Sequence, residues 1–127
     1  MGRNDTINYN KRGESLMNIL INTMTLTVGE NKSEPRIWVE LTKEKMQTLG
    51  VQVGDRFNRV LTDGKIHFGF IDNGKYKLCK KGEGAVADTN GKFLTKNGFR
   101  KGDVVTVQFF RLFESNRVNY FTISKVA

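Results

Sequence analysis

The sequence predicts an all-β protein with one short helix, and three observations carry this prediction. The 127-residue chain holds 13 glycines and nine phenylalanines but a single proline. Asx-Gly pairs, which suit tight turns, recur at short intervals from Asp63 onward. Several stretches also alternate apolar and polar residues. Short strands joined by tight turns explain these features better than a helical bundle, and the length fits one domain with one core.

Residues 1–15 are polar and rich in asparagine, and they show no hydrophobic periodicity. This composition predicts a flexible, disordered N-terminal arm, in which Arg3, Lys11 and Arg12 are available to touch phosphates. Residues 16–127 are assigned to a single domain. Its first apolar stretch is interrupted by asparagine and threonine, so it predicts a strand and no signal peptide. No run of about 18 apolar residues predicts a membrane span.

The first strand is predicted over Asn18–Val28, where threonines alternate with apolar residues. Turn residues gather over Gly29–Pro35, and the chain returns as a second strand, Arg36–Leu41. The two strands are expected to form a hairpin or a longer crossing. Trp38, in the second of them, is assigned to the core.

The single helix is predicted over Thr42–Leu49. Thr42 can cap its first turn, Glu44 suits the positive end of the helix dipole, and Gly50 can take the left-handed closing conformation. The helix is short, at about two turns.

The rest of the chain is predicted to be a meander of hairpins. Asp63-Gly64, Asn73-Gly74 and Asn90-Gly91 can each supply the positive φ angles of a tight turn between strands. Val104–Phe113 and Arg117–Val126 are the longest strand candidates in this part, and they are expected to pair antiparallel.

An internal repeat is the most specific structural signal. Gly50–Asp55 (GVQVGD) and Gly98–Asp103 (GFRKGD) match at a constant offset of 48, and each copy follows a Leu-Thr-Lys. In each copy a helix or turn ends at the first glycine, the apolar residue tucks underneath, and Gly-Asp makes a turn that starts a strand. The first copy holds five extra residues, where the helix is predicted.

The run LTKEKMQTLGVQVGDRFNRV resembles the half-barrel unit of the AbrB-type swapped-hairpin DNA-binding domains, and FLTKNGFRKGDVVTVQFF resembles a shortened form of it. In that family two units combine into a small barrel, and the related double-psi barrels carry both units in one chain. Over about residues 36–70 and 92–126, the resemblance therefore implies a small β-barrel built from two pseudo-repeated halves. The family's usual proline before the helix and its arginine-rich loop have no counterpart here.

The positive charge is unevenly distributed along the chain. Residues 75–127 hold eleven Lys/Arg against four Asp/Glu, a net charge of +7, whereas residues 1–74 have a net charge of +1. A basic segment of this kind attracts polyanions. The candidate nucleic-acid-binding residues are Lys75, Tyr76, Lys77, Lys80, Lys81, Lys92, Lys96, Arg100 and Lys101. Tyr76 is the aromatic residue expected to be exposed, because lysines flank it.

Residues for catalysis or metal binding are few. His67 is the only histidine and lies in a strand, where a structural or solvent-facing role is expected. Cys79 is the only cysteine, so it forms no internal disulfide and has no Cys-x-x-Cys partner for zinc. We therefore expect a protein without cofactor or metal that is not an enzyme. The single cysteine also indicates a reducing compartment, the cytoplasm.

The function predicted from these features is nucleic-acid binding by a basic face, with DNA favoured over RNA by the resemblance. Phosphates would be neutralised by the lysines, and exposed aromatic residues would favour single strands. The alternative is a non-enzymatic interaction module or inhibitor, such as a virus- or plasmid-type accessory protein, that binds an acidic partner protein. A homodimer is compatible with both, because open sheet edges often pair.

Overall fold

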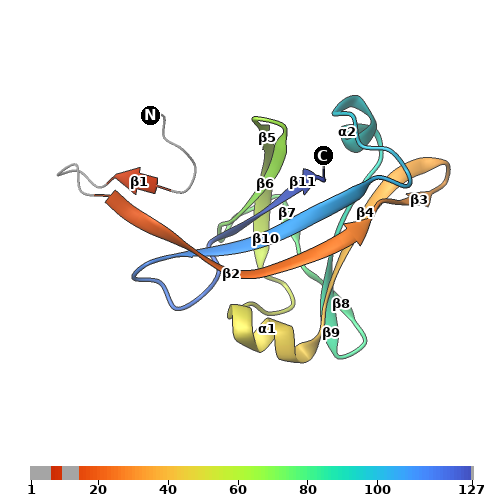
Figure 1. The fold of residues 1–127 in the computed structure, drawn as a ribbon. Helices are drawn as coiled ribbons and strands as arrows, with labels where there is room; N and C mark the ends of the chain where they lie inside the picture. The colour runs from red at the N-terminus through yellow and green to blue at the C-terminus, as the bar shows by residue number, and fades with distance from the viewer. Residues whose placement is uncertain (1–6, 10–14, 127) are drawn as a thin grey trace.

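A computed structural model describes residues 7–9 and 15–126 of the chain (Figure 1). Strands dominate, and two short helices interrupt them. The elements, in chain order, are β1 (Ile7–Tyr9), β2 (Ser15–Thr27), β3 (Gly29–Asn31), β4 (Glu34–Leu41), α1 (Lys43–Leu49), β5 (Arg56–Thr62), β6 (Lys65–Phe70), β7 (Tyr76–Lys77), β8 (Cys79–Lys81), β9 (Gly84–Asn90), α2 (Lys92–Lys96), β10 (Val104–Leu112) and β11 (Tyr120–Lys125). The all-β prediction is confirmed.

The strands form a seven-stranded sheet, ordered β1-β2-β10-β11-β6-β5-β7, and a four-stranded sheet, ordered β3-β4-β9-β8. The chain passes between the sheets four times. Two passages run through helices, from β4 to β5 through α1 and from β9 to β10 through α2, and two are direct, from β2 to β3 at Val28 and from β7 to β8 at Leu78. Val28 and Leu78 are both 1% exposed. Within the described ranges, no continuous ladder closes the two sheets into a barrel. The predicted barrel is therefore not shown by the strand pairing.

The Asp63-Gly64 hairpin and the final strand pair are confirmed. Asp63 and Gly64 have φ angles of 53° and 77°, and they join β5 to β6 where Thr62 lies opposite Lys65. Consecutive positive φ angles match the right-handed twist of the flanking strands, which is why Asx-Gly suits this site. At the end of the chain, β10 and β11 pair antiparallel, with Phe109 opposite Phe121.

The hairpin predicted at Asn73-Gly74 is wrong. Strand β6 already has β5 and β11 as neighbours, so it has no free edge for β7. Strand β7 pairs instead with the outer edge of β5, with Tyr76 opposite Phe57. Gly74 is buried because it packs against the Phe57 backbone, where an added Cβ would lie 2.6 Å from the amide nitrogen.

Asn90-Gly91 leads into a second helix, the five-residue α2, and not into the strand expected after a hairpin turn. Gly91 takes a φ angle of 84° and accepts a backbone hydrogen bond from Leu94, whose side chain is fully buried. The second copy of the repeat therefore carries a shortened helix of five residues.

Of the hairpin or longer crossing predicted between Asn18–Val28 and Arg36–Leu41, the hairpin is wrong, because the chain crosses from one sheet to the other between them. β2 pairs along its length with β10, with a bulge at Phe109/Phe110, whereas β4 pairs with β3 and β9. The turn residues make a smaller hairpin, β3–β4, in which Lys32 and Ser33 have positive φ. The entropic cost of closing a loop grows only slowly with loop length, so β2 can pair with the distant strand β10 instead of its neighbour in sequence.

The predicted flexible arm, residues 1–15, lies largely outside the described residues, and so do Arg3, Lys11 and Arg12. Of its described residues, Ile7–Tyr9 form strand β1, which pairs with the first residues of β2, and Ser15 is the first residue of β2.

The core lies between the two sheets and is rich in phenylalanine. Phe68 and Phe121, opposite each other on β6 and β11, stack with ring centroids 4.5 Å apart, and Phe109 lies 5.1 Å from Phe121. All three are at most 1% exposed. Trp38, by contrast, is not in this core, which corrects its assignment. It is half-buried on the outer face of the four-stranded sheet, where the Arg36 guanidinium lies 3.8 Å from its ring centroid.

The two copies of the repeat make the same turn. In the first, the Gln52 backbone N–H donates to Asp55 Oδ2 at 2.9 Å, and in the second, the Arg100 N–H donates to Asp103 Oδ2 at 2.9 Å. The two Gly-Asp glycines have φ angles of 95° and 94°. Each turn also makes a pair of backbone hydrogen bonds with a crossing residue, the first turn with Leu78 and the second with Val28. The repeat thus holds the two direct crossings between the sheets, at Leu78 and Val28.

We expect Asp103→Ala to lower the free energy of unfolding by about 1 to 2 kcal/mol, because a charge-assisted hydrogen bond to a backbone N–H is lost. The ion pair between Asp103 and Lys125, at 3.5 Å, is partly exposed and adds little. Urea unfolding followed by the fluorescence of the single tryptophan measures the change. Asp103→Asn keeps an acceptor oxygen and should cost less than half as much. Equal losses for the two variants would contradict the role of the hydrogen bond.

Candidate nucleic-acid interface

The basic residues predicted to bind nucleic acid lie at two ends of the molecule. Lys92, Lys96, Arg100 and Lys101 belong to α2 and the turn after it, near the start of β4. Lys80 and Lys81 lie on β8, close to the end of β4, where α1 packs (Figure 1). At about 3.3 Å per strand residue, β4 separates these ends by about 20 Å. Lys80 and Lys81 are therefore not part of one stripe with the α2 residues.

Several predicted cations have acidic neighbours. Lys81 Nζ lies 3.4 Å from Glu40 Oε2, and Lys101 Nζ lies 3.0 Å from Glu30 Oε1. Arg100 and Lys101 also line a hollow that contains Glu30 and Glu34. These carboxylates weaken the local positive potential, so this side of α2 is a poor phosphate site.

Lys75, Lys77, Lys92 and Lys96 are exposed, and none of them forms an ion pair with another described residue. Lys92 and Lys96 stand four residues apart on α2 and so share one face of the helix. Lys75, just before β7, and Lys77, on β7, flank Tyr76, as the sequence indicated.

Tyr76 is not an exposed stacking residue, which corrects the prediction. Its ring is half-buried against the core and stacks on Phe57 with centroids 5.9 Å apart. The guanidinium of Arg59 covers it at 4.4 Å. The pairing of β7 with β5 puts Tyr76 directly opposite Phe57, and this pairing was not evident from local sequence.

Arg59 is the functional candidate that the sequence analysis missed. Its guanidinium lies 4.4 Å from the Tyr76 ring and 4.1 Å from the Phe93 ring on α2. Cation–π contacts of this kind contribute about 0.5 to 2 kcal/mol each. Arg59 thereby ties β5, β7 and α2 together, and the two rings that it contacts are next in sequence to Lys75, Lys77 and Lys92. We call this region the basic patch, made of Arg59, Lys75, Lys77, Lys92 and Lys96.

A row of aromatic rings crosses the outer face of the seven-stranded sheet next to the basic patch. Phe110 on β10 stacks on Tyr120 of β11 at 4.9 Å, and Tyr120 lies 6.0 Å from His67 of β6, with interplanar angles of 14° and 24°. Phe110, Tyr120 and His67 are all half-buried. The three rings come from three different strands, so the row cannot be recognised from local sequence. His67 is a member of it and has a structural environment, as expected.

A shallow hollow of about 410 Å³ lies beside this row, above Gly69. A Cβ added at Gly69 would meet no atom within 4 Å, so the missing side chain leaves this space open. We call it the Gly69 hollow. Its rim is formed by Asn58, Arg59, Val60, His67, Ile71 and Tyr120.

The Gly69 hollow and the basic patch are continuous. Asn58 on the rim accepts a hydrogen bond from the backbone N–H of Lys75, from N to Oδ1 at 2.8 Å. Arg59 lines the hollow and also contacts the Tyr76 and Phe93 rings. A ligand seated in the hollow therefore needs to extend only past Asn58 to reach Lys75.

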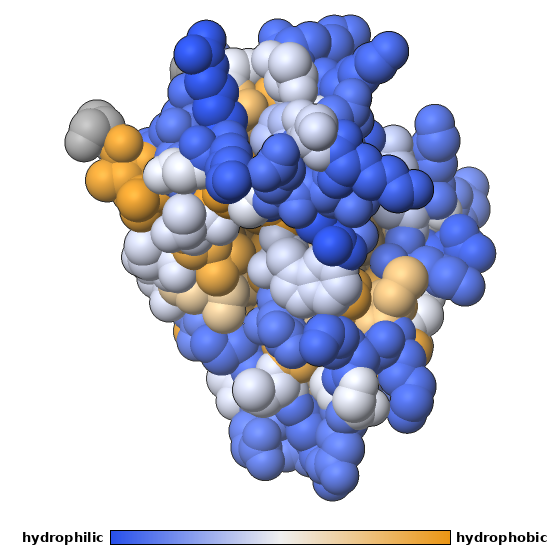
Figure 2. Space-filling model, turned by 90° about the vertical axis from the view of Figure 1, so that its right-hand side faces the viewer, coloured by the Kyte–Doolittle hydropathy of each residue, from blue (hydrophilic) through white to orange (hydrophobic). Residues whose placement is uncertain are grey.

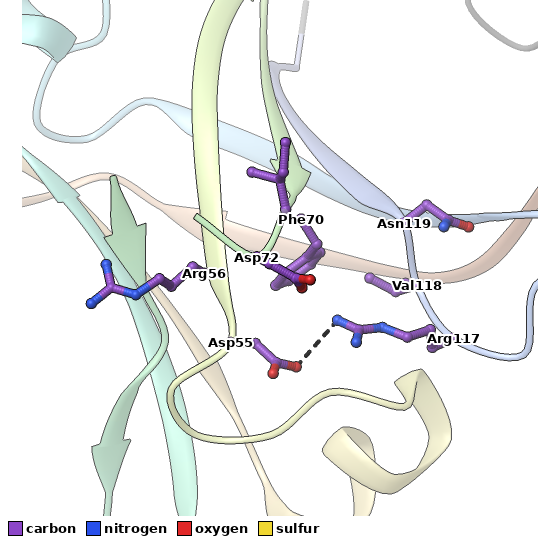
Figure 3. A pocket seen from close by; sticks show the side chains of 8 residues that line it. Asp55, Arg56, Phe70, Asp72, Arg117, Val118 and Asn119 are labelled. Carbon is purple, nitrogen blue, oxygen red and sulfur yellow. Dashed lines mark hydrogen bonds and ion pairs between the residues drawn. The ribbon is translucent and has the colours of Figure 1, made fainter. Parts of the chain in front are cut away.

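A second hollow, of about 240 Å³, lies between the first repeat turn and the loop before β11 (Figure 3). Arg117 reaches across it to Asp55, with Nη2 and Oδ2 3.3 Å apart, while Arg56 extends away and donates to the Gly74 carbonyl. Asp55 Oδ2 also accepts from the Gln52 N–H. These groups hold the turn and the loop in place, so their chemistry is structural.

The outer face of the four-stranded sheet is largely hydrophilic (Figure 2). Arg36 forms a bidentate contact with Asp88, at 2.9 and 3.0 Å, while its guanidinium lies over the Trp38 ring. Lys81 Nζ lies 5.8 Å from the same ring centroid. Ile37, Val39 and Leu41, at alternate positions of β4, are buried, and this alternation was the sequence signal that could have placed Trp38 on the opposite face.

Cys79 is exposed and has no disulfide. No group of three or more His, Cys, Asp or Glu residues that could hold a metal ion occurs in the described part of the chain. Neither of the two described helices has the length and apolar character needed to cross a bilayer.

Comparisons of the chain with family models, with curated proteins and with solved structures found no match.

Proposed function

We propose that this chain is a nucleic-acid-binding protein that uses the basic patch to neutralise phosphates, with DNA favoured over RNA. The observation that carries the proposal is the meeting of β7 and α2 at Arg59. It concentrates Lys75, Lys77, Lys92 and Lys96 on one region without a described carboxylate partner. Unpaired exposed cations on one surface release counterions when they contact a phosphate backbone, and this release drives binding.

The lysines and Arg59 have different parts in this proposal. The four lysines are mobile point charges that follow the backbone of a polyanion. Arg59 is held between two rings, so it loses little side-chain entropy when a ligand binds. The role is binding without catalysis. In support, Asp55 and Asp103, the carboxylates of the repeat, accept hydrogen bonds that hold the turns.

We also propose that the two repeat units are equivalent halves of a barrel-like body of the AbrB type. The units share the order strand, helix, Gly-Asp turn and strand, and their first strands, β4 and β9, pair with each other. Each turn holds the chain where it crosses between the sheets. This arrangement supports the resemblance seen in the sequence, with both halves in one chain.

The proposal is tested with Lys75→Ala, Lys92→Ala and Lys96→Ala combined in one variant. We expect weaker binding to labelled DNA in fluorescence anisotropy. The slope of log K against log salt should fall by about 2 to 3, since each phosphate contact contributes about 0.7 to 0.9. All three residues are exposed, so the midpoint of the unfolding transition should be unchanged.

The matched control removes the same charge from the other end of the molecule, in the combined variant Lys43→Ala, Lys80→Ala and Lys81→Ala. These residues are exposed and lie on α1 and β8. The control should bind DNA nearly as well as the unaltered chain. Equal weakening by both variants would show that only net charge matters, and absence of binding at about 50 mM salt would overturn the proposal.

One observation favours a second function, a non-enzymatic interaction module that binds an acidic partner protein. Tryptophan and arginine are the residues most enriched among interface hot spots, and Arg36, Trp38 and Lys81 lie together on the four-stranded sheet. Binding of this kind would be lost in Trp38→Ala and kept in the Lys75, Lys92 and Lys96 variant. Nucleic-acid binding predicts the opposite pattern.

A further inference from the structure

The Gly69 hollow is a gap in an otherwise side-chain-covered sheet face. We infer that it receives one unpaired base of a single-stranded nucleic acid, whose backbone continues onto the basic patch. This inference rests on the proposed function and narrows it, because it selects single strands over duplexes.

The aromatic row gives the hollow a stacking wall. Gly69 lies directly opposite both Tyr120 on β11 and Asn58 on β5, so a base above Gly69 has the Tyr120 ring on one side. Tyr120 is itself supported by Phe110 at 4.9 Å, which fixes the plane of its ring. Bases stack on such rings regardless of their identity, because every base has a π face.

The rim opposite Tyr120 carries a polar group suited to a base edge. The Asn58 side-chain oxygen accepts from the Lys75 N–H at 2.8 Å, which identifies the oxygen and orients the amide. The Nδ2 group is then a donor without a hydrogen-bond partner among the described residues. A base in the hollow offers ring nitrogens and carbonyl oxygens as acceptors for this donor.

Charge decides between the candidate occupants. Val60 and Ile71 on the rim are 57% and 50% exposed, so a second copy of the chain could also cover this face. Each copy carries a net charge of +8, however, and the basic patch begins at the rim of the hollow. Repulsion between two such surfaces disfavours self-association, whereas a polyanion is attracted to both parts at once.

A duplex does not meet these requirements. Its bases are paired and stacked inside, and extruding one costs a few kcal/mol. In a single strand the base is already free, so the hollow and the lysines of β7 can be occupied together. The path runs from Gly69 across Asn58 to Lys75, all of which are joined by described contacts.

The test fills the hollow with the variant Gly69→Leu. The backbone at Gly69 does not require a positive φ and no atom lies near its Cβ position, so the fold should tolerate the leucine. We expect affinity for a labelled oligothymidylate to fall by about tenfold or more, since stacking of one base contributes about 1 to 3 kcal/mol. Affinity for a duplex of the same length, and its salt slope, should stay unchanged.

The matched control is Thr25→Leu, which adds a leucine to an exposed position of β2 in the same sheet. It should bind oligothymidylate normally. Normal binding by Gly69→Leu would overturn the inference, and if the combined lysine variant still binds weakly, the proposed function survives. No binding of either nucleic acid by the unaltered chain would overturn both. A dimer in sedimentation that Gly69→Leu dissociates, with oligothymidylate binding unchanged, would assign the hollow to a second copy.

Discussion

Gly84→Ala is expected to lower the free energy of unfolding by about 3 kcal/mol or more, because overpacking against rigid backbone leaves nothing that can move aside. Gly84 is buried at the start of β9, directly beside the end of β4. A Cβ there would overlap the carbonyl oxygen of Leu41 and lie 3.1 Å from its carbonyl carbon. Either the start of β9 or the end of β4 must shift, and these two strands pair with each other in the middle of the four-stranded sheet.

Urea unfolding followed by tryptophan fluorescence measures this loss, since Trp38 lies on the same sheet. Gly69→Ala is the matched control, because it makes the same change in a strand where no atom lies within 4 Å of the new Cβ. Alanine costs less backbone entropy than glycine, so this control should be unchanged or more stable by about 0.5 kcal/mol. Equal stability of the two variants would contradict the close approach of β9 to Leu41.

Features that depend on a few neighbouring residues could be predicted from the sequence. The Asp63-Gly64 turn needs positive φ at two adjacent positions, and the sequence supplies the residues that tolerate it. Helix α1 begins after Thr42, whose hydroxyl accepts from the Lys45 N–H, and it closes at Gly50 with φ 74°. Each of these signals is complete within about eight residues.

Strand partners could not be predicted in the same way. Asn73-Gly74 has the sequence of a hairpin turn, but β6 already has a neighbouring strand on both sides. The turn therefore leads the chain to the free edge of β5, where β7 pairs. Helix α2 was missed because its core contact, Leu94, becomes evident only when β4 and β9 are placed below it. Tertiary packing therefore overrode local propensity at both sites.

The candidate site likewise combines features that local sequence predicts with features that depend on tertiary contacts. The lysines of β7 and α2 were found because charge is visible in the sequence. The link between β7 and α2 depends on Arg59, which contacts both Tyr76 and Phe93. Arg59 and Phe93 are 34 positions apart in the sequence, so this contact is not evident from local sequence. The aromatic row draws one ring from each of β6, β10 and β11. Alternation along a strand shows which face a ring occupies but not which strand lies beside it.

Phe121→Ala is expected to destabilise the protein by about 3 to 5 kcal/mol, the usual range for removing a buried phenylalanine. Phe121 is 1% exposed on β11, the strand that joins β10 to β6. Its ring stacks on Phe68 at 4.5 Å with planes only 3° apart, and it lies 5.1 Å from Phe109. The alanine would leave a cavity walled by these two rings, and neither can move far within a closely packed core.

The matched control is Phe113→Ala, because Phe113 is 65% exposed in the loop after β10. Its loss should change stability by no more than about 0.5 kcal/mol. The contrast also bears on binding, since Tyr120, the neighbour of Phe121, faces the Gly69 hollow on the other side of the sheet. Phe121→Ala should therefore weaken oligothymidylate binding more than duplex binding, because it removes the packing that holds β11 in place. Both affinities are measured under conditions in which Phe121→Ala and Phe113→Ala remain folded. A Phe121→Ala protein as stable as the control would contradict the position of β11 at the centre of the core.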